Sequence, residues 1–189
     1  MYDNQYGFRP GLSTTKAVEC LIKIIMNNFE NKIITGTTLI DLTKAFDCVS
    51  HDILFEKLNY YGISKNALKL IISYFNERKQ TVICNGIESN LGTVIAGVPQ
   101  GSVLGPFFFL VYINDLKYNV PCFPILYADD TTLIDANTNI HDLNQKMSTS
   151  LEFAELWFEQ NNLSINHSKT ENIMFALNPK LKMLTLINL

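Results

Sequence analysis

Apolar and polar residues alternate along the chain with two different periods, which predict a mixture of helices and strands. The helical period begins after Ser13, whose hydroxyl can cap a helix, and it returns over residues 140–160. A β-branched run over residues 33–42 predicts a buried strand that ends in the carboxylate of Asp41.

Shorter elements are predicted between and after these three. In chain order they are helices over 52–61 and 65–77 (the second capped by Ser64), a strand over 81–84 entering an Asn85-Gly86 turn, an apolar helix opened by Pro106, a hairpin over 123–135 and paired strands over 163–166 and 172–175. Strands joined by tight turns pair antiparallel, and helices and strands follow no regular βαβ order. The predicted fold class is therefore α+β, an antiparallel sheet packed on helices.

The 189 residues are 47% hydrophobic and 17% charged, which excludes a disordered linker and suits one compact domain or one lobe of a larger protein. No apolar stretch approaches the roughly 20 residues that a membrane span needs. Residues 1–11 carry no apolar signal-peptide core, so the predicted location is intracellular, in the nucleus or the cytoplasm. The four cysteines lie far apart and form no CxxC pair, which favours reduced thiols in the core.

Three carboxylates stand where strands should be most apolar: Asp41 at the end of the β-branched run, and Asp129 and Asp130 at the tip of the predicted hairpin. Each alone is typical of a turn or a capping residue. Two carboxylates about 4 Å apart repel each other by roughly 4 kcal/mol at an effective dielectric constant of about 20, and a bound cation would remove that cost. Oxygen ligands favour Mg²⁺ or Mn²⁺, and such a cluster suits two-metal phosphoryl transfer.

Residues 97–106, GVPQGSVLGP, combine three glycines with two prolines and fit neither a plain helix nor a plain strand. Glycine lets a ligand approach the backbone closely, although an ordinary structural turn uses the same residue types. Gln100 is wedged between Pro99 and Gly101, so its side chain is expected to be exposed and fixed in direction.

Five segments of the chain, in order, resemble the motifs of a known family. The segments are NQYGFRPGLST, LIDLTKAFDCVSHDIL, GVPQGSVLGPFFFLVYINDL, YADDTTLI and LSINHSKTENIMF. The first is similar to the fingers motif, and the other four to the palm motifs, of reverse transcriptases of the non-LTR (LINE-type) retrotransposon family. The resemblance runs from Asn4 to Phe175, and five segments in the family's order leave little room for coincidence.

This resemblance implies an RNA-directed DNA polymerase that adds dNTPs to a DNA primer on an RNA template. The family's two Mg²⁺ ions, which Mn²⁺ can replace, would be bound by Asp41, Asp129 and Asp130 as catalytic residues. The backbone carbonyl of Leu42 is implied as a further metal ligand. Lys169 stands where the family's lysine protonates the leaving pyrophosphate.

The resemblance also implies a set of nucleotide-binding residues. Phe46 would lie beneath the sugar of the incoming nucleotide and exclude a 2′-hydroxyl. Gln100 and Gly101 would shape the nucleotide pocket. Arg9 would hold a phosphate or the template, although an arginine on such a turn is as often structural.

The family's organisation implies a division of the chain into fingers and palm. The expected ranges are fingers-like 1–32 and 53–95, palm-like 33–52 and 96–178, and the start of a thumb connection over 179–189. The expectation is of a truncated fragment, since the basic fingers segment that precedes Asn4 in the family, the helical thumb and the endonuclease are missing. Those parts carry the family's basic surfaces, which agrees with the net charge of -3.

Two alternatives stay open at this point. The carboxylates alone would also suit an unrelated Mg²⁺-dependent phosphatase or nuclease, although the PQG loop and the fingers motif favour the polymerase. The other alternative is a catalytically inactive retrotransposon remnant that acts at most as a structural or interaction protein. Intact Asp41, Asp129 and Asp130 argue against long neutral decay.

Overall fold

The computed structural model describes residues 1–177, which fall into two compact units. The first unit comprises Met1–Ala45 and residues 113–177, and the second is Phe46–Tyr112. These units reflect which residues pack together, and their bounds do not test the expected division into fingers and palm. That division stays a prediction. The expected thumb connection over 179–189 lies outside the described residues.

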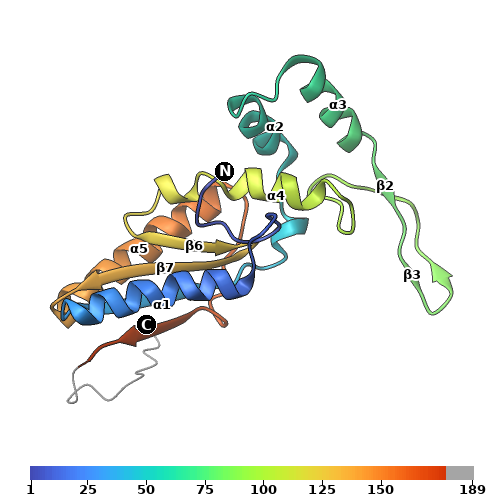
Figure 1. The fold of residues 1–189 in the computed structure, drawn as a ribbon. Helices are drawn as coiled ribbons and strands as arrows, with labels where there is room; N and C mark the ends of the chain where they lie inside the picture. The colour runs from blue at the N-terminus through green and yellow to red at the C-terminus, as the bar shows by residue number, and fades with distance from the viewer. Residues whose placement is uncertain (178–189) are drawn as a thin grey trace. The chain divides into compact units, whose positions relative to one another are not determined.

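A four-stranded antiparallel sheet forms the centre of the first unit (Figure 1). Its strands are β1 (Ile34–Ile40), β6 (Phe123–Tyr127), β7 (Asp130–Asn137) and β8 (Glu171–Phe175). They lie in the order β6-β7-β1-β8, so β1 pairs with two strands that follow it by about 90 residues or more along the chain. The β-branched residues of β1 are nearly all buried, as expected for a strand with neighbours on both sides.

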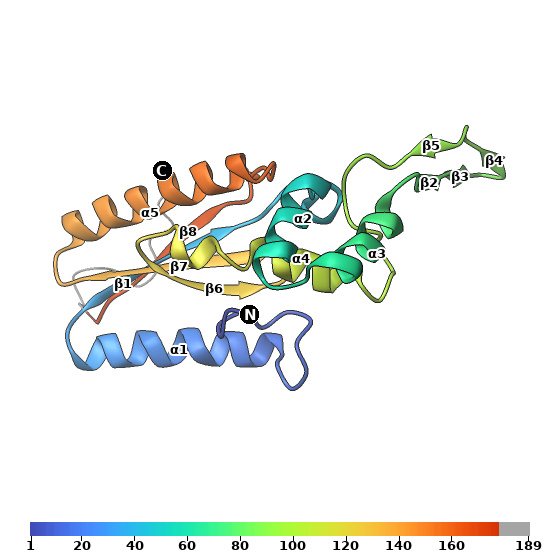
Figure 2. The same ribbon diagram turned by 90° about the horizontal axis from the view of Figure 1, so that it is seen from above.

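Helices cover both faces of this sheet (Figure 2). On one face lies α1 (Thr14–Glu30), where Ala17 packs with Ile125 and Ile134 of the hairpin. On the other lies α5 (Ile140–Gln160), which contacts β7 and β1. Gly36 lets α5 come close, because a Cβ there would lie 2.2 Å from the sulfur of Met147.

The second unit combines three helices with two short β-ladders. Its elements are η1 (Ala45–Asp47) at its start, α2 (His51–Tyr60), α3 (Lys65–Phe75), the paired strands β2 (Lys79–Gln80) and β5 (Gly92–Thr93), the paired strands β3 (Ile83–Cys84) and β4 (Ile87–Glu88), and α4 (Gly105–Ile113). Phe75 and Phe108 are buried at its core, with ring centroids 5.2 Å apart. A second 3₁₀ turn, η2 (Leu116–Tyr118), comes after α4 in the sequence and belongs to the first unit.

Most predicted elements are confirmed. The Ser13 hydroxyl accepts from the backbone N–H of Lys16 and caps α1 as expected, and α5 has the predicted bounds. Asn85 and Gly86 both have positive φ angles and join β3 to β4, as the asparagine–glycine pair predicts. No helix in the part of the chain that the structure describes is long and apolar enough to cross a membrane.

Two local predictions about secondary structure are wrong. Residues 163–166 form no strand; Ile165 makes a single antiparallel bridge with Leu42 instead. Of the two strands expected at this end, only β8 forms, and it pairs with β1 rather than with residues 163–166. Ser64 does precede α3, but its side chain makes no capping hydrogen bond.

The prediction of core thiols is also wrong in part. All four cysteines are free, but Cys84 is exposed and the other three are only partly buried.

Candidate active site

The register of the sheet brings Asp41 and Asp130 to the same end. Ile40, the last residue of β1, pairs with Thr131 of β7, so Asp41 follows β1 where Asp130 begins β7. Ala128 and Asp129 form the two-residue turn between Tyr127 of β6 and Asp130 of β7. Three aspartates from two distant parts of the sequence therefore lie at the same end of the sheet.

The carboxylates influence one another electrostatically. The pKa of Asp130 is raised above its ordinary value, first by partial burial and then by the negative charges of Asp129 and Asp41. Lys169 lies near the same group, with its Nζ 3.6 Å from Oδ2 of Asp41. Both side chains of this ion pair are more than one-third exposed, so the pair contributes little to stability. Its importance is local, since it places an ammonium group beside the carboxylates.

The loop before β8 holds both Asp41 and Lys169. The backbone N–H of Asn166 donates to the carbonyl of Asp41 at 2.8 Å, and the N–H of Lys169 donates to the carbonyl of Asn166 at 3.0 Å. The bridge between Leu42 and Ile165 fixes the same loop one residue further along. Leu42 is buried, and its neighbour Thr43 donates its N–H to the carbonyl of Ser164.

The donor chemistry of this site fits a hard divalent cation. Carboxylate oxygens are the ligands that Mg²⁺ and Mn²⁺ prefer, and a cation would offset the repulsion of Asp130 by Asp129 and Asp41. Within residues 1–177, however, no three His, Cys, Asp or Glu side chains are grouped closely enough to hold a metal ion together. The carboxylates would have to draw closer to share one.

Gln5 holds the turn that carries Asp129, although no pattern in the sequence singles this residue out. Its side chain is 1% exposed, and Oε1 accepts from the N–H groups of Gly7 at 2.8 Å and Ala128 at 2.9 Å. Its Nε2 donates to the carbonyl of Ala128 at 3.4 Å. The only signal in the sequence was its place in NQYGFRPG, since one glutamine in a polar segment forms no pattern.

Gly7 and Arg9 support the same contact. A Cβ on Gly7 would lie 2.2 Å from the backbone nitrogen of Ala128, so only glycine permits this close approach. Nη1 of Arg9 donates to the carbonyls of Tyr2, Asp3 and Gln5 at 2.8, 3.2 and 3.0 Å. These bonds favour the structural role of Arg9 over the phosphate-binding one, which stays a prediction.

Three predicted nucleotide-binding residues belong to the second unit. Phe46 is half-buried and stacks on Phe109, with ring centroids 4.3 Å apart and an interplanar angle of 21°. Gln100 is exposed and fixed in direction as expected, because its Nε2 donates to Oδ1 of Asp47 at 2.7 Å. Gly101 has a φ of 78°, with open space where a Cβ would stand.

Comparison with known families shows where this chain belongs. A family model described as reverse transcriptase (RNA-dependent DNA polymerase) matches residues 1–186. The chain belongs to this family. The resemblance to reverse transcriptases of non-LTR retrotransposons is thereby confirmed, and so is the α+β fold class that it implies.

Curated relatives of this reverse transcriptase chain come from mobile elements. It is 34% identical over 189 residues to the "Probable RNA-directed DNA polymerase from transposon BS" of Drosophila melanogaster, a match that covers 93% of this chain and 20% of the relative. It is 30% identical to the "RNA-directed DNA polymerase from mobile element jockey" of the same organism, over 91% of this chain and 20% of the relative. The chain thus spans about a fifth of the length of these relatives.

The fold of this reverse transcriptase chain also occurs among solved structures. Apo telomerase from Candida tropicalis, truncated from its C-terminal domain, superposes with a TM-score of 0.66 at 17% identity, covering 93% of this chain and 38% of that one. Telomerase from the same organism, in complex with a fragment of telomeric RNA, gives a TM-score of 0.61 at 15% identity, covering 86% and 29%. At these identities the similarity shows a shared fold.

Proposed function

We propose that this chain carries the catalytic carboxylates of an RNA-directed DNA polymerase, which transfers a nucleotide from a dNTP to the 3′-hydroxyl of a DNA primer on an RNA template. The observation that supports this proposal is the position of Asp41, Asp129 and Asp130 at one end of the sheet in a member of the reverse transcriptase family. Asp41, Asp129, Asp130 and the carbonyl of Leu42 would hold two Mg²⁺ ions, or Mn²⁺ in their place. Membership of the reverse transcriptase family argues against an unrelated Mg²⁺-dependent phosphatase or nuclease.

Bound metal would lower the pKa of the attacking hydroxyl and neutralise charge on the leaving group. The chain's own residues supply the rest of the site. Gln5 and Gly7 fix the turn of Asp129, and Asn166 fixes the backbone of Asp41. Lys169, 3.6 Å from Asp41, would hold the proton that the leaving pyrophosphate takes up.

Phe46, Gln100 and Gly101 would bind the nucleotide, whereas Arg9 keeps the structural role that its bonds to three backbone carbonyls favour. The rigid ring of Phe46 is held by its stacking on Phe109, which suits a residue that rejects a 2′-hydroxyl by steric clash. Gln100 is oriented by Asp47, and the bare backbone of Gly101 leaves room for a ligand. These roles rest on motif positions together with this local order.

The experiment is a chimera in which this chain replaces the matching region of the transposon BS polymerase. We expect the chimera to extend an oligo(dT) primer on poly(rA) with dTTP and Mg²⁺. Asp41→Asn should lower the rate at least about 100-fold, as does the loss of one group from a preorganised electrostatic site. The matched control is Asp3→Asn, which removes an exposed carboxylate outside the site and should leave the rate unchanged. In the same chimera, Phe46→Val should raise ribonucleotide incorporation relative to deoxynucleotide incorporation.

A folded chimera that binds primed template but extends nothing, beside an active parent, would favour the inactive remnant. Equal rates for Asp41→Asn and the unaltered chimera would remove Asp41 from the catalytic group. An unchanged ratio of the two incorporation efficiencies in Phe46→Val would show that Phe46 is only a packed aromatic residue.

A further inference from the structure

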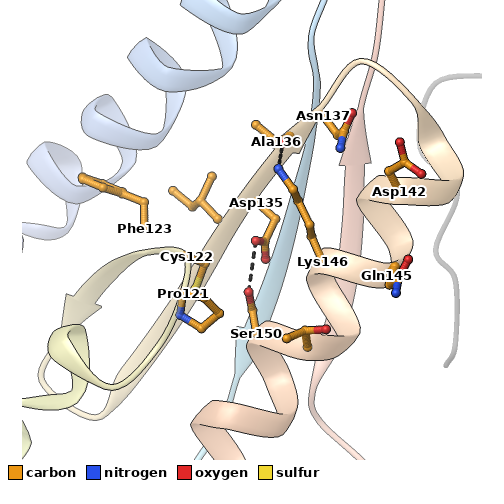
Figure 3. Close-up of a pocket in the computed structure, with 12 residues that line it drawn as sticks. Pro121, Cys122, Phe123, Asp135, Ala136, Asn137, Asp142, Gln145, Lys146 and Ser150 are labelled. Atoms are coloured by element: carbon orange, nitrogen blue, oxygen red, sulfur yellow. Dashed lines mark hydrogen bonds between the residues drawn. The ribbon is translucent and has the colours of Figure 1, made fainter.

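A pocket of about 690 Å³ lies on the α5 side of the sheet, between β7, the N-terminal half of α5 and the segment before β6 (Figure 3). The proposed catalytic residues do not line it. Asp135 lies five residues along β7 from Asp130, a separation of about 17 Å at the rise of an extended strand. The volume falls within the range of pockets that bind small molecules.

A buried carboxylate points into this pocket (Figure 3). Asp135 is 7% exposed, and its Oδ1 accepts from the hydroxyl of Ser150 at 3.0 Å. Its other oxygen, Oδ2, is buried and has no hydrogen-bond partner in the part of the chain described by the structure. Leaving a buried polar atom unpaired is costly, and native proteins rarely do so without a ligand, an ion or water at the site.

The side chains around Asp135 do not supply the missing donor. Lys146 directs its Nζ to the carbonyl of Ala136 at 3.3 Å. Burial, and then the charge of Asp135, raise the pKa of the Cys122 thiol to about 11, so the thiol is neutral at physiological pH. Asp142 also lines the pocket, which therefore holds two carboxylates against one ammonium group.

We infer that this pocket binds a small organic cation whose guanidinium or ammonium group donates a hydrogen bond to Oδ2 of Asp135. The excess of negative charge among the lining residues favours a cation over a neutral donor. Pro121, in the segment before β6, gives an apolar surface for a short alkyl chain. This site is independent of the proposed polymerase activity.

The test is an NMR titration of the isotope-labelled chain with N-butylguanidinium chloride, with N-butylurea as a neutral ligand of matched shape. We expect saturable shifts of the amides of Asp135, Ser150 and Lys146 with the guanidinium, and binding weaker by about tenfold or more with the urea, since charge-assisted hydrogen bonds are the stronger ones. Equal shifts with both ligands, or no saturable shift with the guanidinium, would overturn the inference.

Two variants separate the buried carboxylate from the rim. Asp135→Asn keeps the shape and removes the charge, so it should weaken guanidinium binding by about tenfold or more. Asp142→Asn removes a carboxylate in the first turn of α5 and should change the affinity less than about threefold, as surface charges do. An unchanged affinity in folded Asp135→Asn would refute the site. If that variant does not fold, the comparison of the two ligands on the unaltered chain still decides.

Discussion

The buried side-chain amide of Gln5 supports the turn that leads into Asp129. Its Oε1 accepts two backbone N–H groups, one from its own segment and one from the turn between β6 and β7. Because Ala128 has a φ of 57°, which non-glycine residues rarely adopt, the turn needs such external support. The N-terminal segment is thus part of the candidate active site although it carries none of its carboxylates.

Gln5→Ala is expected to lower the free energy of unfolding of the first unit by roughly 1–3 kcal/mol, because two buried N–H groups lose their acceptor. The same substitution should accelerate hydrogen exchange at the backbone amide of Ala128. The measurement is denaturant unfolding followed by the fluorescence of Trp157, the chain's single tryptophan, which is 4% exposed in α5. Asn4→Ala is the control, since that half-buried side chain donates to the hydroxyl of Tyr2 and accepts from the hydroxyl of Tyr6. An unchanged exchange rate at Ala128 would show that the turn keeps its conformation without Gln5.

The sequence could reveal the aspartates but not the residues that hold their backbone in place. Carboxylates within apolar runs break a pattern, and the family motifs mark the same positions. Gln5 and Asn166 act through hydrogen bonds to backbone groups that are distant in sequence, and no periodicity encodes such bonds. The hydrogen bond from Gln100 to Asp47 could not be foreseen for the same reason, since the two residues are far apart in the sequence.

At the scale of elements, the packing of α5 on β1 depends on the absence of one side chain. Gly36 lies in the middle of β1 opposite Asp135, and the buried sulfur of Met147 occupies the place of its missing Cβ. Glycine normally weakens a strand by roughly 0.5–1 kcal/mol relative to alanine. Here the close approach of the helix outweighs that cost.

Gly36→Ala is expected to destabilise the chain by roughly 1–3 kcal/mol, the usual cost of overpacking a core. In a Met147→Ala background the same change should cost much less, because the atoms it meets are gone. The two single variants and the double variant, unfolded in denaturant, form a double-mutant cycle that isolates this contact. Additive effects of the two substitutions would mean that the helix shifts as a whole.

Elements with local signals were predictable, and elements with distant partners were less so. The Ser13 cap, the Asn85-Gly86 turn and the period of α5 are properties of a few neighbouring residues, and all were confirmed. The segment 163–166 resembles a strand in its residue types but makes only one bridge, from Ile165 to Leu42, where β1 has already ended. A strand forms there only if another strand lies beside it, and residue types alone do not show which strand that would be.

At the scale of the whole chain, the first unit retains two carboxylates whose charge is unfavourable in the fold. Burial raises the pKa of Asp130 and of Asp135 above their ordinary value. The three aspartates of the sheet end are explained by a proposed catalytic role, and Asp135 by a proposed ligand. In both places the chain accepts a loss of stability, as functional sites commonly do.

Asp135→Asn is expected to raise the free energy of unfolding near pH 7 by about 1 kcal/mol, with a gain that vanishes at low pH. Below pH 3.8, the ordinary value, Asp135 is neutral in both folded and unfolded chains, so its charge contributes nothing. Above that pH the unfolded chain ionises first and binds fewer protons than the folded one, so the stability of the unaltered chain falls until the raised pKa is passed. Denaturant unfolding at pH 3, 5 and 7, followed by Trp157 fluorescence, should show the difference between the two proteins growing with pH. Asp3→Asn, at an exposed position, should show no such growth. A difference that is constant over this range would report only the exchanged hydrogen bond to Ser150, and would mean that the folded chain does not penalise the charge of Asp135.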